Sequence, residues 1–366
     1  VYLDGAGSGS TTTLLGPGVG NGIYVDGGAD GSTIEGFLIA DFGYGLYLGG
    51  VSGNPLQGIT VTNNVIRDCT TGAVTGTYVY TGTFADNAFH HNTGFGFDVD
   101  SGNGNTIVNN HIYENTGFGL RVRSNNSLVS RNNIHNVGWD GIRIGSGATN
   151  TRVLTNTVSD TNGGTGGGYD LGGIALNGTT GTRVEGNTVT YVRAGGGSNT
   201  AGVALDGSNA GTVILNNMIR NNVNHGIWIS SSGYSAASPP EIHGNSIYSN
   251  GRFGMYNDST ASPFPNAVGN WWGRNSPIVS SSPSGTGDIY AGWNEIYSPV
   301  IRLTLGRWPT AIVADGVSTS TITATMRSSG PVYPVLEGTL ISFTTSLGDL
   351  ESPTVVRSTV DGQTPA

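Results

Sequence analysis

The chain has 366 residues, 62 of them glycine, and its 24 acidic and 15 basic residues give a formal net charge of −9. Every basic residue is arginine, and an acidic chain without a basic run is a poor nucleic-acid binder, because that binding begins with phosphate neutralisation. The single cysteine, Cys69, excludes a disulfide within the chain and a thiolate metal site. No stretch reaches the roughly 20 apolar residues of a membrane helix.

Asparagine recurs at a nearly constant interval in the frame Asn-x-apolar. The steps from Asn64 to Asn156 are 23, 23, 22 and 24 residues, and wider steps continue to Asn270. A period in the low twenties is typical of a solenoid, in which we expect these side chains to stack and hydrogen-bond to one another, a structural role rather than ligand binding. The frame begins at Asn64, Asn87, Asn110, Asn132, Asn156, Asn187, Asn217, Asn245 and Asn270.

A second element, Gly-apolar-x-apolar, predicts short strands with two side chains inward and one outward. It begins at Gly22, Gly45, Gly96, Gly119, Gly141, Gly173, Gly202 and Gly226. Strands of this kind, separated by Gly, Asn, Ser and Thr turns, indicate an all-β chain that coils as parallel strands. The two frames resemble the right-handed parallel β-helix family of secreted and surface proteins. That resemblance implies a solenoid of about ten coils over residues 1–273 and a secreted, extracellular location.

Charged residues occupy the outward positions of three successive strands. Asp98 and Asp100 belong to one coil, Arg121 and Arg123 to the next, and Arg143 to the one after. One interpretation is a polysaccharide lyase site, in which Asp98 and Asp100 hold Ca²⁺ against a uronate and an arginine removes the adjacent proton. The interpretation we favour is cross-coil ion pairing of Asp98 with Arg121 and of Asp100 with Arg123. We expect no other cofactor.

Other candidate groups are dispersed along the sequence. Asp26, Asp140, Asp170 and Asp206 fall in separate coils, which argues against the clustered carboxylates of a glycoside hydrolase. The outward rings of Tyr24, Tyr47, Trp228 and Tyr256 are candidates for stacking against sugar. The six histidines do not share one column, so we expect turn or surface roles rather than metal binding: His90, His91, His111, His135, His225 and His243.

The repeat ends in Gly269-Asn270-Trp271-Trp272-Gly273. This segment resembles the terminal coil of bacterial and archaeal secreted β-helix proteins. We expect Trp271 and Trp272 to cover the open apolar end, with a sugar-stacking platform as the alternative. Residues 274–308 are assigned to the terminal coil, cap and linker.

Residues 309–366 show alternating strands separated by turns, the pattern of an antiparallel sandwich. Residues 314–324 and 341–348 are similar to bacterial immunoglobulin-like domains of the invasin and intimin type. About 57 residues follow Pro309, fewer than the roughly 100 of a complete sandwich, so we expect this domain to be incomplete.

Without a convergent catalytic cluster, the sequence favours a non-catalytic structural or adhesive protein of a prokaryotic cell surface, such as a fibre, filament or surface-layer component. The chain begins inside a coil and ends in an incomplete sandwich. We therefore expect it to assemble head to tail with its own copies by strand addition, or to bind other surface proteins or polysaccharide. The alternative is an extracellular polysaccharide-active enzyme, a Ca-dependent uronate lyase that uses Asp98 and Arg121, or a carbohydrate-binding β-helix.

Overall fold

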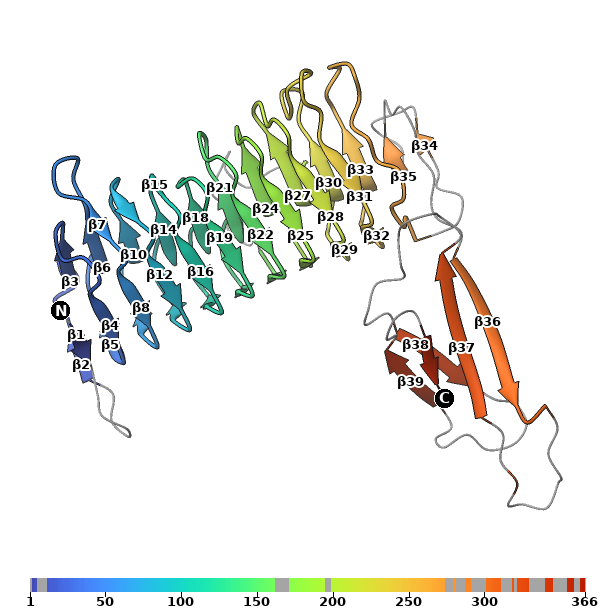
Figure 1. The fold of residues 1–366 in the computed structure, drawn as a ribbon, viewed down its shortest axis with the longest axis horizontal. Helices are drawn as coiled ribbons and strands as arrows, with labels where there is room; N and C mark the ends of the chain where they lie inside the picture. The colour runs from blue at the N-terminus through green and yellow to red at the C-terminus, as the bar shows by residue number, and fades with distance from the viewer. Residues whose placement is uncertain are drawn as a thin grey trace.

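The structure is a computed structural model that describes residues 2–4, 12–161, 171–194, 199–273, 279–280, 287–290, 301–310, 318, 321–328, 340–344, 354–358 and 363–365. Stacked parallel strands form a rod, and antiparallel strands follow it (Figure 1). Within the described residues no helix is long and apolar enough to cross a membrane.

Each coil of the rod contributes one strand to each of three sheets, which we call A, B and C. One coil contains β12 (Thr83–Ala85) in sheet A, β13 (Ala88–His90) in sheet B and β14 (Phe97–Val99) in sheet C. These strands pair in parallel, residue for residue, with β16 (Thr106–Val108), β17 (His111–Tyr113) and β18 (Leu120–Val122) of the next coil. Sheets A and B have ten strands each, which confirms the predicted all-β parallel solenoid of about ten coils.

The remaining strands of sheets A and B flank these in spatial order. Sheet A also contains β1 (Tyr2–Asp4), β4 (Thr33–Glu35), β8 (Thr60–Thr62), β19 (Leu128–Ser130), β22 (Arg152–Leu154), β25 (Arg183–Glu185), β28 (Val213–Leu215) and β31 (Glu241–His243). Sheet B also contains β2 (Thr12–Leu15), β5 (Phe37–Ala40), β9 (Val65–Arg67), β20 (Asn133–His135), β23 (Thr157–Ser159), β26 (Thr188–Thr190), β29 (Met218–Arg220) and β32 (Ser246–Tyr248).

Sheet C is the longest, with 12 strands, and a small three-stranded sheet lies beside it. Its other strands are β3 (Asn21–Asp26), β6 (Tyr44–Gly49), β10 (Thr71–Thr75), β21 (Ile142–Ile144), β24 (Gly172–Asn177), β27 (Ala201–Asp206), β30 (His225–Ile229), β33 (Phe253–Asn257), β35 (Gly287–Tyr290) and β34 (Val279–Ser280). The small sheet consists of β15 (Gly102–Asn103), β11 (Val79–Tyr80) and β7 (Leu56–Gln57).

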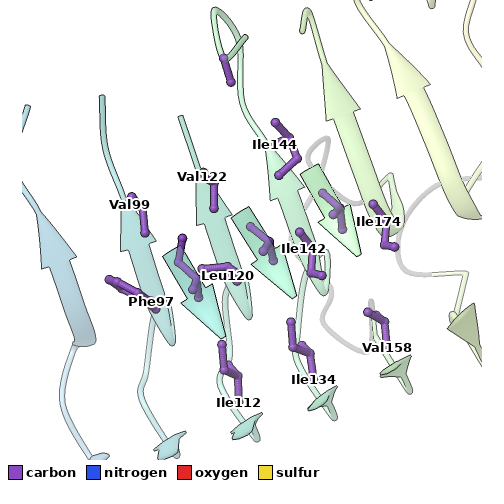
Figure 2. Close-up of a cluster of buried hydrophobic side chains, with 14 of the residues drawn as sticks. Phe97, Val99, Ile112, Leu120, Val122, Ile134, Ile142, Ile144, Val158 and Ile174 are labelled. Carbon is purple, nitrogen blue, oxygen red and sulfur yellow. The ribbon is translucent and has the colours of Figure 1, made fainter. Parts of the chain in front are cut away.

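The core of the rod is a set of stacked apolar columns. Phe97, Leu120, Ile142 and Ile174 occupy equivalent positions of successive strands in sheet C, and all four are fully buried. Figure 2 shows their side chains pointing into the rod toward residues such as Ile134 of sheet B. Alternation in each strand therefore places one face in the core and leaves the other free to carry function.

The corner between sheets A and B is a tight turn that ends in the repeated asparagine. The residue before that asparagine has a positive φ, for example 57° at Asp86 and 56° at Asn109, a conformation that Asn and Asp tolerate better than most residues. The chain thereby turns from one sheet to the next within two residues.

The repeated asparagines form a continuous hydrogen-bonded column from Asn64 to Asn270. The Oδ1 atom of Asn132 accepts from the backbone N–H of Asn110 at 2.9 Å and from its Nδ2 at 3.0 Å. Asn132 Nδ2 in turn donates to Asn156 Oδ1 at 3.0 Å. Each side chain thus satisfies buried backbone groups of neighbouring coils.

A shorter asparagine column, which the repeat frames did not predict, lies at the corner between sheets B and C. Asn92 donates to Asn115 at 2.8 Å, and Asn222 donates to Asn250 at 2.9 Å. The intervening coils carry Val137, Thr161 and Val192 at this corner, so the column is interrupted.

Trp272 is 2% exposed and packs into the core of the rod, while Trp271 forms a parallel bridge with Ser246 and is half-buried. The two indoles therefore differ in burial, and Trp272 is the one that closes this part of the core. Sheet C continues past both of them in β35.

The antiparallel strands form two separate sheets. One contains β36 (Ile301–Trp308), β37 (Thr321–Ser328) and β40 (Gln363–Pro365), and the other β38 (Leu340–Thr344) and β39 (Thr354–Ser358). Residues 301–308, assigned above to the linker, pair along their whole length with β37. The turns expected between these strands lie outside the described residues. The pairing establishes antiparallel strands, and the immunoglobulin-like sandwich stays a prediction.

Candidate functional site

The outward side chains of sheet C form a straight line along the rod, which we call the outer column. Strand pairing is continuous in register along it, so neighbouring members are about 4.8 Å apart. From the first coil to the last it contains Tyr24, Tyr47, Val74, Asp98, Arg121, Arg143, Ala175, Ala204, Trp228 and Tyr256. Aromatic residues stand at both ends and charged residues in the middle.

Three tyrosines at the N-terminal end form an open aromatic surface, the tyrosine patch. The rings of Tyr24 and Tyr47 are stacked, with centroids 5.5 Å apart, and Tyr44 meets Tyr47 edge-on at 5.6 Å. Tyr24 is 54% exposed and Tyr44 42%. The Asp26 carboxylate raises the pKa of Tyr24, so its hydroxyl stays protonated and able to donate. Exposed rings beside a carboxylate offer both stacking and hydrogen bonding to a sugar.

The charged residues of the next coils are paired with one another. Asp98, 8% exposed at its side chain, accepts from Arg121 Nε at 2.8 Å and Nη2 at 2.5 Å. Arg123 Nη2 lies 3.0 Å from Asp100 and 3.8 Å from Asp98. The four residues that the sequence pattern groups together are therefore in contact in the structure.

Arg143 lies on the same face but pairs elsewhere. Its Nη1 donates to Asp140 Oδ2 at 2.8 Å, and Asp140 Oδ1 accepts from the backbone N–H groups of Leu171 and Gly172 at 2.7 and 2.8 Å. Arg143 also lies over the Phe118 ring at 5.2 Å, as Arg121 lies over Phe95 at 4.6 Å. These contacts hold both guanidinium groups against aromatic rings.

This pairing restricts the chemistry that the charged group can perform. Burial alone lowers the pKa of Arg121, but its hydrogen bonds to Asp98 and the charges of Asp98 and Asp100 outweigh burial and raise it. A guanidinium held in its charged form is a poor proton acceptor. The Asp98 carboxylate is already engaged by Arg121, and no group of three or more His, Cys, Asp or Glu among the described residues is arranged to hold a metal.

A second apolar cluster lies on the outer side of sheet C near the C-terminal end of the rod. It contains Ala201, Ala204, Trp228, Phe253 and Tyr256, all at most 9% exposed. His225 is fully buried, and its ring stacks on Phe253 at 5.7 Å and on Tyr256 at 4.8 Å.

Some polar atoms of this cluster lack partners. Among the described residues, neither ring nitrogen of His225 has a hydrogen-bond partner, nor does Nε1 of Trp228. Burial, with the nearby charge of Arg252, lowers the pKa of His225 to about 3, so the ring is neutral at pH 7. Buried unpaired polar groups are unfavourable, which makes this cluster a candidate for polar contacts with a ligand.

Two carboxylates beside the cluster are not neutralised by arginine among the described residues. Asp206 accepts from Ser230 Oγ at 2.7 Å and from Asn177 Nδ2 at 3.2 Å, and Asp258 lies 3.5 Å from the Tyr256 hydroxyl. In the sequence, Asp206 stands alone in its coil and Asp258 belongs to neither repeat frame. The signal that could have identified Asp206 and Asp258 is that each lies at the end of a strand of sheet C.

Four of the six histidines gather on the outer side of sheet B, where they occupy two columns and an adjoining turn. His90 and His135 stand in one column with Tyr113 between them, and His91 and His111 lie next to them. His91 lies in a turn, whereas the other three lie in strands. Because the four occupy different positions in their coils, a search for one repeat period in the sequence does not find them.

Two shallow grooves formed by described residues lie at corners of the rod and not over sheet C. Asp86, Asn109 and His111 help to line one, and Glu114, Asp160 and Arg193 help to line the other. Neither groove therefore includes a member of the outer column.

The chain belongs to the right-handed β-helix family, whose model matches residues 16–158 and 124–271. The structure is similar to that of a point mutant of the periplasmic alginate epimerase AlgG, with a TM-score of 0.53 and 16% identity over 68% of this chain and 61% of that chain. This chain therefore spans less than two thirds of that enzyme.

Two further solved structures are similar at lower scores. The A-module of the Azotobacter vinelandii mannuronan C-5 epimerase AlgE4 has a TM-score of 0.49 and 16% identity, over 81% of this chain and 87% of that module. The pectate lyase Pel9A has a TM-score of 0.42 and 14% identity, over 74% of this chain and 78% of that chain. At these identities the likeness establishes the fold. No curated protein matches the sequence.

These similarities correct the expectation of a non-catalytic structural or adhesive protein. One solved structure that shares this rod is that of an alginate epimerase, so the rod itself does not favour a non-catalytic protein. That expectation relied on the lack of an obvious carboxylate cluster in the sequence. In a solenoid, residues that lie side by side are separated by a whole coil, so a dispersed sequence does not distinguish a structural rod from an enzyme.

Proposed function

We propose that this protein binds a polysaccharide along the outer column of sheet C and acts on it there. The observation that carries the proposal is the tyrosine patch, in which the exposed rings of Tyr24 and Tyr44 and the half-buried ring of Tyr47 stand at the start of a straight line of outward side chains. A contiguous exposed aromatic surface often marks a ligand-binding site.

The length of the outer column favours a polymer. Before the column becomes fully buried at Ala175, the six strands from Tyr24 to Arg143 span about 24 Å at about 4.8 Å per strand, which is longer than a single sugar. The alginate epimerase shares this fold, which makes an acidic polysaccharide the first ligand to test. The paired arginines in the middle of the column carry the positive groups that would lie nearest to its carboxylates.

Within this proposal, Asp206 and Asp258 are the acid–base groups. They are two strands apart at one edge of the outer column, which corresponds to about 9.6 Å between strand positions. Inverting glycoside hydrolysis uses two carboxyl groups roughly 6.5–9.5 Å apart, one to protonate the leaving oxygen and one to activate water. Asp98 and Asp140 are weaker candidates because an arginine neutralises each.

Affinity electrophoresis in gels containing alginate, polygalacturonate or a neutral glucan tests binding. We expect retardation by at least one polymer, and the Tyr24→Ala/Tyr47→Ala variant should bind about tenfold more weakly, since two stacking rings are lost. Tyr191→Ala is the matched control, because Tyr191 is 52% exposed but lies outside the outer column. Equal retardation of all three proteins would refute the tyrosine patch as the binding surface.

Activity is tested separately on the polymer that is retarded. New reducing ends should appear with the intact protein, and Asp206→Asn or Asp258→Asn should reduce their rate by at least about a hundredfold. Asp86→Asn is the control, since Asp86 is exposed at the corner between sheets A and B and asparagine tolerates its positive φ. Binding without new reducing ends would leave the surface in place and reject hydrolysis. The secreted, extracellular location stays a prediction.

A further inference from the structure

A row of polar side chains follows the C-terminal ends of four successive sheet C strands, and we call it the edge column. Asn177 ends β24 and is the register partner of Asp206, which ends β27. Ser230 and Asp258 continue the row, because their backbone N–H groups donate to the preceding strand at 2.9 and 2.8 Å. The edge column stays accessible where the outer column is buried, since Asp206 is half-buried and Asp258 is exposed.

The carboxyl group of Asp206 is held by a hydrogen bond on each of its oxygens. Its Oδ1 accepts from Ser230 Oγ at 2.7 Å, and its Oδ2 accepts from Asn177 Nδ2 at 3.2 Å. Because an amide nitrogen only donates and each carboxylate oxygen has two lone pairs, both oxygens keep a lone pair for a further contact. The carboxyl group is therefore fixed in orientation and arranged to accept a proton rather than to give one.

Asp258 has different surroundings. It is exposed, and among the described residues its polar contact is the Tyr256 hydroxyl at 3.5 Å, the long limit of a hydrogen bond. Its carboxyl group can therefore turn toward a glycosidic oxygen and give it a proton. Two carboxyl groups in unlike environments take different parts in acid–base catalysis.

We propose that Ser230 is a positioning residue that holds Asp206 as the general base, with Asp258 as the general acid, an inference that rests on the proposed function. Asp206 removes a proton from a water molecule whose oxygen forms a bond to the anomeric carbon. Asp258 gives its proton to the glycosidic oxygen as the bond between that oxygen and the anomeric carbon breaks, and the anomeric centre is inverted. Ser230 is 6% exposed and acts through Asp206 rather than on the sugar.

Steady-state hydrolysis of the polymer that is retarded tests the role of Ser230. Ser230→Ala removes the donor from Asp206 Oδ1, so kcat should fall about tenfold while KM changes by less than about twofold. Ser230→Thr keeps the hydroxyl group and should restore most of the lost rate. Ser232→Ala is the matched control, because Ser232 is exposed and its hydroxyl lies 3.5 Å from that of Ser230. Thermal unfolding of each variant checks that the rod remains folded.

A substrate with a better leaving group separates the two carboxyl groups. Nitrophenolate leaves without a proton, so Asp258→Ala should keep most of its activity on a nitrophenyl glycoside of an oligosaccharide from that polymer, although it loses activity on the polymer itself. Asp206→Ala should be inactive on both substrates. Nuclear magnetic resonance of the first product should show the inverted anomer.

The inference and the proposed function fail in different ways. Hydrolysis by the intact protein with an unchanged kcat in Ser230→Ala, with the two aspartate variants exchanged in the nitrophenyl test, or with a retained anomer would overturn the inference and leave hydrolysis in place. No hydrolysis by the intact protein rejects the proposed reaction, and the inference with it.

Discussion

At the scale of single residues, the stability of the charged pairs depends on how far each carboxylate is buried. Asp98 is 8% exposed at its side chain, and Arg121 covers it through two hydrogen bonds. Arg183 and Glu185 are equally close, at 2.6 Å, but their side chains are 41% and 32% exposed. Removing one partner from a buried pair leaves an uncompensated charge, whereas an exposed charge is stabilised by water.

We therefore expect Arg121→Ala to lower the free energy of unfolding by about 3 kcal/mol, and Arg183→Ala by less than about 1 kcal/mol. Urea unfolding of both variants beside the intact protein measures the difference. Losses of equal size would show that Asp98 is solvated in spite of its burial.

His225 predicts a pH effect on stability. The pKa of an unfolded histidine is about 6.5, and burial with the Arg252 charge lowers it to about 3 in the folded chain. Between these values the unfolded state binds the proton more readily. The contribution of buried, neutral His225 to the free energy of unfolding is therefore complete above about pH 6.5, and it decreases as the pH falls toward 3.

Acidification from pH 7 to pH 5 should cost the intact protein about 2 kcal/mol more than a His225→Phe variant, whose ring fits the same stack but does not titrate. The comparison cancels the other titrating groups, which both proteins share. Parallel losses in the two proteins would mean that His225 is not protonated on unfolding in this range.

At the scale of the coil, the corner between sheets A and B depends on the asparagine column. Asn132 accepts two hydrogen bonds from Asn110 and donates to the Ile107 carbonyl at 3.0 Å and to Asn156. The next residue, Asn133, faces solvent in β20.

Asn132→Ala should lower the free energy of unfolding by roughly 2–3 kcal/mol, because it leaves buried donors and acceptors unpaired. Asn133→Ala changes the same atoms one position later and should change stability by less than about 0.5 kcal/mol. Chemical denaturation measures both. A small effect at Asn132 would mean that neighbouring amides or water replace the missing bonds.

Much of this coil architecture could be predicted from the sequence. The Asn-x-apolar frame recurs without a break from Asn64 to Asn270, and each of its asparagines marks a corner between sheets A and B. The column of Asn92 and Asn115 could not, since Val137 and Thr161 interrupt it. The contacts of Asp98 with Arg121 follow from counting strand positions. The buried stack around His225 depends on residues from several coils and on side-chain orientation, which a repeat frame does not specify.

At the scale of the whole molecule, the rod has three outer faces, one on each sheet, and their side chains differ in chemistry. Sheet C carries the outer column, and sheet B carries the group of four histidines. Because every coil repeats the same strand positions, one substitution per coil is sufficient to form a continuous surface along the rod. A solenoid can therefore present a long surface whose chemistry changes from coil to coil.

A crystal structure of the protein with an oligosaccharide of the polymer that retards it tests the central claim most directly. The account predicts sugar rings stacked on Tyr24 and Tyr47, with the chain following sheet C toward Trp228. Sugar bound on sheet A or sheet B, or across the rod and away from the tyrosine patch, would contradict it.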